Sequence, residues 1–293
     1  MPPYKKQHYL PAAYLKYFST DQTNCTRDAS VWRLDRHALR QVPIVSQCSS
    51  DYFYSKTKPA DTEAMFQQIE TALCNCVDKI KLGRILTGRE YGQLLLAIFD
   101  LHLRNATHKN MTGKEGIDAY NLRSRIFMSK ILLGKKNIDA TKRDITTHVG
   151  HYWGVEIVST PPGHEFVTSD HPSVWITLRK PFAQTKPSLH MATLPLTPTH
   201  TAVAYDRRVL DVIANTATDD DDQTLNGGQI QNAEKCIYTS TCMAENQLET
   251  VKYQLTNKTD LACEVYDTGW QLALQHLPAD HYFSFIRLKP PLF

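Results

Sequence analysis

Glycine is scarce in this sequence, long hydrophobic runs are absent, and neither sign of charge is in clear excess. With 12 glycines in 293 residues, collagen-like and glycine-rich architectures are excluded. The longest purely apolar run spans residues 94–99, whereas a helix that crosses a bilayer needs roughly 20 apolar residues. We therefore expect no membrane partner.

The charge balance excludes binding of nucleic acid by the net charge of the whole molecule. Lysine and arginine total 33 against 30 acidic residues, for a net charge of +3. Any contact with RNA would need a local basic patch. Residues 79–89 and 104–125 are the candidates, and a solvated helix face is the alternative for both.

The cysteines do not have the spacing of a structural zinc site. There are seven, and none forms a C-x-x-C pair, so free thiols in a reducing cytosol are the simpler expectation. The charged start of the chain is followed by no apolar stretch of the signal-peptide type, so we predict a cytoplasmic protein. P-loop, G-x-G-x-x-G, G-x-S-x-G and H-E-x-x-H motifs are also absent, which removes support for those enzyme classes.

The hydrophobic residues, 42% of the chain, suffice for a sizeable core, and their spacing predicts an α+β fold. We expect one integrated domain over 1–293, with a helix-rich part at 1–148, a mostly antiparallel sheet at 149–210 and C-terminal helices at 225–293. The expected helices cover 9–18, 61–80, 88–103, 117–133, a short stretch after 139, and 245–255. The expected strands cover 31–34, 41–45, 152–158, 165–167, 174–178, 190–196 and 201–205.

Two further local expectations concern the region before 233. The acidic run 219–222 is most simply a solvated loop. A helix is expected to begin after Gly227 and Gly228, with Asn226 as a candidate N-cap.

Two ordered motifs resemble a known family. The first is residues 8–18, HYLPAAYLKYF, and the second is residues 166–172, FVTSDHP. Further similar features are residues 51–54 and 194–198 and the side chains of Glu70, Arg104, Asn226 and Asn232. Over about residues 4–240, the sequence is similar to a bacterial and phage-borne family known as domain of unknown function 4238. Ala12 stands where that family usually has glutamine. The resemblance implies a bacterial origin and association with mobile elements, and hence a role in defence or as a toxin.

His8 and Asp170 are the first candidates for a catalytic role. Histidine titrates near neutrality and serves as general acid or base, whereas a packing or capping histidine is the alternative. The Asp170 carboxylate at a strand end could orient a histidine, bind a ribose hydroxyl or hold a divalent metal. The alternative for Asp170 is a turn that satisfies backbone amides only.

Glu70 and Arg104 are candidates for a functional or a structural pair. Glu70 lies in an otherwise apolar helical register, so an inward side chain needs a partner, and Arg104 is the natural one. Asp100 stands at i,i+4 from Arg104. Arg104 with His108 could instead bracket one phosphate from a shared helix face.

The candidate substrate-binding residues surround the same motifs. They are Tyr9, Thr168, Ser169, His171, Asn226 and Asn232. The two asparagines could equally be helix caps.

These residue types predict a nuclease, with RNA as the expected substrate. Phosphodiester cleavage needs a proton acceptor, a proton donor and cationic stabilisation, which His8, Asp170 and Arg104 could supply, with Glu70 as a second base. The alternative is a non-catalytic sensor that recognises a nucleotide or phage component for a partner effector. A structural ion-pair network is the third option. The cofactor stays open, a divalent metal being one candidate, and a defence-system or antitoxin protein is the expected protein partner.

Overall fold

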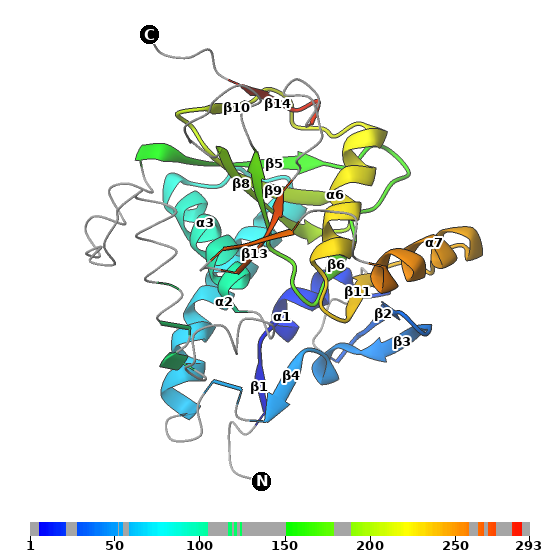
Figure 1. Ribbon diagram of the computed structural model, residues 1–293. Helices are drawn as coiled ribbons and strands as arrows, with labels where there is room; N and C mark the ends of the chain where they lie inside the picture. The colour runs from blue at the N-terminus through cyan, green and yellow to red at the C-terminus, as the bar shows by residue number, and fades with distance from the viewer. Residues whose placement is uncertain are drawn as a thin grey trace.

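The computed structural model describes most of the chain and shows helices and strands in mixed order (Figure 1). The described residues are 6–21, 28–51, 53–54, 59–104, 117–118, 120–121, 124, 151–178, 189–257, 263–266, 269–273 and 283–288. The helices are α1 (Ala12–Leu15), α2 (Pro59–Lys81), α3 (Gly88–Leu103), α6 (Asp219–Asn232) and α7 (Glu245–Thr256). Short 3-10 turns follow at Lys16–Phe18 and Ile44–Ser46.

The strands form four sheets. The N-terminal strands are β1 (Lys6–His8), β2 (Ser30–Asp35), β3 (Leu39–Pro43) and β4 (Ser49–Asp51). The middle strands are β5 (Trp153–Ser159), β6 (Thr168–Ser169), β7 (Val174–Leu178), β8 (Leu189–Thr197), β9 (His200–Asp206) and β10 (Leu210–Val212). The last are β11 (Cys236–Thr239), β12 (Cys263–Tyr266), β13 (Gly269–Ala273) and β14 (Ile286–Leu288).

The largest sheet has the strand order β12-β13-β7-β8-β9-β5, and only the β13–β7 pair is parallel. A second sheet, β3-β2-β11-β6, joins N-terminal strands to strands from the middle and the end of the chain. Two-stranded pairs, β1-β4 and β10-β14, complete the set. The expected mostly antiparallel arrangement is therefore confirmed.

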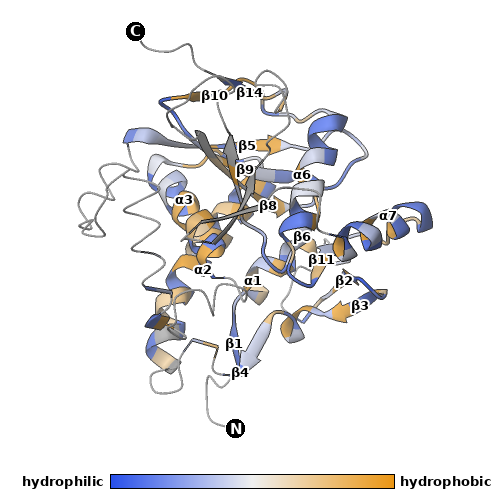
Figure 2. Cartoon of the chain, viewed as in Figure 1, coloured by the Kyte–Doolittle hydropathy of each residue, from blue (hydrophilic) through white to orange (hydrophobic). Residues whose placement is uncertain are grey.

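The side chains of β5, β7, β8 and β9 alternate between two hydrophobic cores, one on each face of the large sheet. Trp175, Ala202 and Ala204 belong to the core shared with α1, α2 and α3. Their neighbours Ile176 and Val203 belong to a separate core on the opposite face. That second core includes Leu225 of α6 and residues of β10 and the segment before β14. Figure 2 shows the strong hydrophobic colouring of α3 where it packs near β5 and β8.

A third, smaller core lies under α6 and α7. It joins Leu34 of β2 and Ile237 of β11 to Ile230 of α6 and to Val251 and Leu255 of α7. These two helices are thereby attached to the four-stranded sheet rather than to α2 and α3. Figure 1 shows α6 and α7 at the side of the molecule away from α2.

Most local expectations hold. The expected helix at 61–80 lies in α2, the helix at 88–103 is α3, and 245–255 lies in α7. Thr87 and Glu90 form a complete capping box at the start of α3. The strands expected at 31–34 and 41–45 are the antiparallel neighbours β2 and β3, and Pro43 lies on the edge strand, where a missing backbone donor is tolerated.

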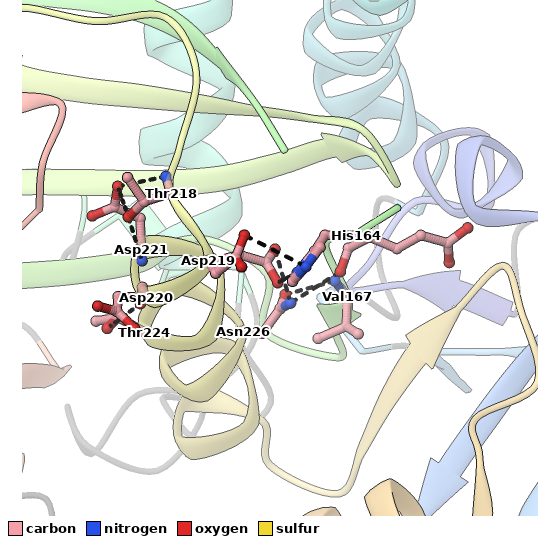
Figure 3. A network of polar contacts seen from close by, with 10 residues as sticks. His164, Val167, Thr218, Asp219, Asp220, Asp221, Thr224 and Asn226 are labelled. Carbon is pink, nitrogen blue, oxygen red and sulfur yellow. Dashed lines mark hydrogen bonds and ion pairs between the residues drawn. The ribbon is translucent and has the colours of Figure 1, made fainter. Parts of the chain in front are cut away.

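The start of α6 was predicted wrongly. The acidic run is not a solvated loop: it is the first turn of α6, and Thr218, not Asn226, is the N-cap. The Thr218 hydroxyl accepts a hydrogen bond from the Asp221 amide, and the Asp221 carboxylate accepts one from the Thr218 amide, as Figure 3 shows. The four aspartates in this turn also interact favourably with the positive end of the helix dipole. Gly227 and Gly228 therefore lie inside the helix.

Other boundaries also differ from expectation. The N-terminal part is not simply helical, because β1 to β4 all lie before residue 52, and the C-terminal part contains β11 to β14. The expected helix 9–18 is a single α-turn, Ala12–Leu15, continued by a 3-10 turn, because Pro11 is the N-cap. The strand expected at 165–167 is β6, shifted to Thr168–Ser169. The helix expected after 139 falls outside the described residues, as does most of 117–133.

The capping box of α6 gives a testable prediction for stability. Thr218→Ala removes the hydroxyl that accepts from the Asp221 amide, and the expected loss is about 1 kcal/mol of unfolding free energy. Urea unfolding followed by circular dichroism measures it. The control is Thr224→Ala, since that hydroxyl only donates back to the Asp220 carbonyl and its loss should stay within about 0.5 kcal/mol. Equal effects of the two substitutions would contradict the assignment of Thr218 as the cap.

Candidate functional site

Arg104, at the end of α3, is the centre of a buried polar cluster. Its side chain is 2% exposed. Nη1 donates to Glu70 Oε1 at 2.8 Å and lies 3.4 Å from Asp100 Oδ2. Nε donates to the Tyr54 hydroxyl at 3.2 Å, and Nη2 donates to the His8 carbonyl at 2.8 Å. The predicted pairing of Arg104 with Glu70 and Asp100 is therefore present.

The environment of Arg104 favours its charged form. Burial opposes the charge, but Tyr54, Asp100 and Glu70 outweigh burial and hold the pKa of Arg104 above its ordinary value. The guanidinium also lies over the Phe66 ring, 4.1 Å from its centroid. Every nitrogen of this guanidinium has a protein partner, so in this conformation Arg104 connects α2, α3 and β1 rather than facing a ligand.

Arg104 bonds Glu70 and His8 through two different nitrogens. His8 ends β1, pairs with Ser49 of β4, and has its Nε2 3.4 Å from the Val45 carbonyl. Glu70, on α2, keeps 23% of its side chain exposed. Both residues are half-buried, and the contact that joins His8 to Arg104 is made by the His8 backbone carbonyl.

Tyr9 connects this region to Asp170. Its amide donates to the Cys48 carbonyl at 3.0 Å, and its ring packs on Phe53. Burial raises the pKa of the Tyr9 hydroxyl, and the neighbouring Cys48 and Asp170 raise it further. Tyr9, which follows His8 in the chain, is therefore within electrostatic range of Asp170.

The Asp170 carboxylate is occupied by backbone amides. Oδ1 accepts from the Glu234 amide at 2.8 Å and Oδ2 from the Lys235 amide at 2.9 Å. The Asp170 side chain thus holds the connection that leads from α6 into β11. This is the amide-satisfying role that was the alternative to a catalytic one, although its partners are more than 60 residues away.

The remaining residues of the Thr-Ser-Asp segment also bond within the protein. The Thr168 hydroxyl lies 2.7 Å from that of Tyr14. Ser169 Oγ donates to Gln229 Oε1 at 3.0 Å. His171 Nε2 lies 3.2 Å from the His102 carbonyl, and the two imidazoles stack.

Three amide side chains on α6 form hydrogen bonds with the backbone of this segment. Asn226 Oδ1 accepts from the Val167 amide at 2.8 Å (Figure 3). Gln229 Nε2 donates to the Pro172 carbonyl at 2.7 Å, and Asn232 Nδ2 to the His171 carbonyl at 2.6 Å. Steps of three residues put all three amides on one helix face. Sequence reasoning proposed Asn226 and Asn232 as caps or ligand contacts and missed Gln229, although the spacing of three signalled a shared face.

A pocket of about 750 Å³ lies between α6, α7 and the segment before β6. The polar side chains that line it include His164, Glu165, Asp222, Asn226, Thr241 and Gln247. Apolar lining comes from Val167, Ile230, Met243 and Val251. Of the sequence-predicted site residues, only Asn226 lines this pocket.

An imidazole on the pocket wall is held in place by a carboxylate. His164 Nδ1 lies 3.2 Å from Asp222 Oδ2, and Nε2 lies 3.6 Å from Asp219 Oδ1 (Figure 3). Asn226 Nδ2 bonds the other oxygen of Asp222 at 3.2 Å. Burial raises the pKa of Asp222, against the lowering effect of His164. Neither His164 nor Asp222 was singled out from the sequence, because the acidic run was interpreted as a loop.

Metal binding has no obvious location in the described part of the chain. Among the residues outside the masked segments, no group of three or more His, Cys, Asp or Glu side chains is arranged to hold a metal ion. The helices within these ranges also lack the combination of length and apolar composition that a bilayer crossing requires. Cys48, Cys74, Cys76, Cys236 and Cys242 are free thiols.

Comparison with known proteins gives one match. The sequence model of DUF4238, described as a protein of unknown function, matches residues 6–242. Neither the curated proteins nor the solved structures gave a match. The matched range covers both the Arg104 cluster and most of the pocket.

Arg104→Met tests the structural role of the buried guanidinium. The substitution leaves the Asp100 carboxylate, with 3% side-chain exposure, without its cation, and a broken buried pair costs about 3–5 kcal/mol. Chemical denaturation measures the loss.

Arg208→Met is the matched control, because Arg208 pairs with Asp206 while 48% exposed. Its loss should cost less than about 1 kcal/mol. A folded Arg104→Met protein with near-normal stability would show that Arg104 is not the anchor described above.

Proposed function

Since the chain belongs to the DUF4238 family, described as proteins of unknown function, we propose its function from its own residues: it is a binding module that holds a small polar molecule in the pocket between α6 and α7. Like the sensor hypothesis, this proposal is non-catalytic, but it uses a different pocket, which shares only Asn226 with the residues predicted from the sequence. A nuclease is the second candidate.

The pocket itself carries this proposal. Its volume of about 750 Å³ lies within the 300–1,000 Å³ of ordinary small-molecule sites. Its apolar side chains can bury the body of a ligand, and the convergent amides, hydroxyls and carboxylates can fix its orientation. The Arg104 cluster, by contrast, has its guanidinium and the Asp100 carboxylate engaged with protein groups.

The pocket walls are held rigidly on two of their sides. On α6, Asp222 and Asn226 are bonded to each other, and Asn226 is bonded to the segment before β6 at the Glu165 carbonyl and the Val167 amide. On the β11 side, Glu165 accepts from the hydroxyls of Ser240 and Thr241. Such preorganisation lowers the entropic cost of binding a ligand.

A module of this kind needs a partner that acts on the bound state. We include in the proposal a defence-system or antitoxin protein as that partner, because the family resemblance implies association with mobile elements. Binding would change the stability of the α6–α7 region, which a partner surface can sense.

Filling the pocket is the direct test. Gly227 lines the pocket, and a Cβ built on it meets nothing within 4 Å, so Gly227→Trp places an indole in the cavity without backbone strain. In a thermal-shift screen of small polar compounds, we expect hits that stabilise the wild type and not the Gly227→Trp protein. A ligand at 100 times its Kd adds about 2.7 kcal/mol.

Gly92→Trp is the matched control. Gly92 also lies in a helix with nothing within 4 Å of its Cβ position, but it is in α3, away from the pocket. Its response to each hit should equal that of the wild type. Hits that stabilise all three proteins alike, or no hits at all, would contradict the proposal.

A nuclease centred on His8 and Glu70 is the second candidate. The observation in its favour is that Arg104 donates to both the His8 carbonyl and the Glu70 carboxylate, which places an imidazole-bearing residue and an acid beside one guanidinium. In this version Arg104 is a positioning residue, and His8 and Glu70 supply acid–base chemistry on RNA.

His8→Ala and Glu70→Gln test the second candidate. Each should lower the single-turnover cleavage of labelled RNA by about 10²-fold or more, the usual contribution of a general acid or base, with a Tm within a few degrees of the wild type. Ser49→Ala, next to His8 in the β1–β4 pair, is the control and should cleave normally. Unchanged cleavage in both variants, or no cleavage by the wild type, would remove the nuclease hypothesis.

A further inference from the structure

Two carboxylates face the pocket from separate elements. Glu165 belongs to the segment before β6, and Asp222 belongs to the first turn of α6. Asp219, in the same turn, lies 3.6 Å from His164 Nε2. The acidic groups therefore come to the cavity from two directions rather than from one surface run.

Within the part of the chain that the structure describes, the Glu165 carboxylate accepts hydrogen bonds from uncharged donors. Ser240 Oγ lies 3.0 Å from each of its carboxylate oxygens, and Thr241 Oγ1 donates at 2.9 Å. Hydroxyl donors orient a carboxylate without neutralising it. Glu165 thus brings to the pocket a carboxylate that is not paired with any lysine or arginine of the described residues.

Among the described residues, Asp222 pairs with no lysine or arginine. Its side-chain partners are the Asn226 amide and the His164 imidazole, and His164 also lies against Asp219, so two carboxylates share one imidazole. Burial disfavours the ionised form and raises the pKa of Asp222. A cation that entered the pocket would therefore relieve an unfavourable charge.

Positive side chains do not line the cavity. Among the described residues that form its walls there is no lysine or arginine, and histidine occurs once, as His164. The hydroxyls and amides of Thr239, Asn246 and Thr250 supply further uncharged contacts. A site with this lining attracts cations and repels phosphate, sulfate and carboxylate groups.

We infer that the ligand of the pocket is a small amine, a positively charged and hydroxyl-bearing molecule of the amino-sugar type, bound by Glu165 and Asp222. This inference rests on the proposed binding function and specifies its ligand class. It also separates the pocket from phosphate chemistry, because a nucleotide would bring two or more negative charges to walls that carry the same sign.

The test compares three disaccharides that differ in charge. The probes are the fully deacetylated glucosamine disaccharide, its N-acetylated form and cellobiose, each titrated calorimetrically into the full chain at millimolar concentration. The amine should bind at least about ten-fold more tightly than the two neutral sugars, the scale of one charge-assisted contact. Its affinity should fall as salt is added.

Conservative variants assign the charge selection to named residues. Glu165→Gln and Asp222→Asn keep the shape and remove the charge, so each should weaken amine binding by roughly ten-fold and leave the N-acetylated sugar unchanged. Glu249→Gln is the control, since Glu249 lies on α7, is 70% exposed and does not line the pocket. It should bind like the wild type.

The outcomes separate the inference from the proposed function. Equal or tighter binding of a neutral sugar, abolished by Gly227→Trp, overturns the amine inference and leaves pocket binding intact. The amine inference is also overturned if the amine fails to bind while an uncharged or anionic hit from the screen binds in the pocket. A screen without any pocket-dependent hit overturns both.

Discussion

The rest of the structure depends on the mutual hydrogen bonding of α6 and the segment from Val167 to Ser173. Amides of α6 bond the backbone of the segment, and the Asp170 carboxylate accepts the two amides that follow α6. Because each side satisfies buried polar groups of the other, neither can move without leaving unsatisfied groups behind. This reciprocal bonding fixes β6 in the four-stranded sheet and sets one wall of the pocket.

The Arg104 cluster plays the corresponding role for the N-terminal elements. A guanidinium with 2% exposure is retained only because carboxylates, a tyrosine hydroxyl and a backbone carbonyl satisfy it. The same residue types would suit a phosphate-binding catalytic centre. Composition therefore does not separate the two roles, whereas the burial of the guanidinium and its full set of protein partners favour the structural one.

The pocket depends on segments that are far apart in the chain. Glu165 meets Ser240 across 75 residues, and His164 meets Asp222 across 58. Its acidic walls come from residues that look unremarkable in the sequence: one lies before a β-strand, and the other is within a run typical of solvated loops. Their common location gives the chain a candidate binding site with the opposite electrostatic preference from the one that the basic residues had suggested.

What the sequence by itself determined was local. It fixed the strands β2 and β3, the capping box of α3, the strands β7 and β9, and the long helical registers of α2 and α3. These features depend on residues a few positions apart, whose steric and hydrogen-bonding preferences act before any tertiary contact forms. Only the tertiary structure decided that Asp170 and Asn232 bond distant backbone groups, that Thr218 caps α6, and that His164, Glu165 and Asp222 share a cavity. Those outcomes depend on which distant groups the packing brings within hydrogen-bonding distance of each buried donor and acceptor.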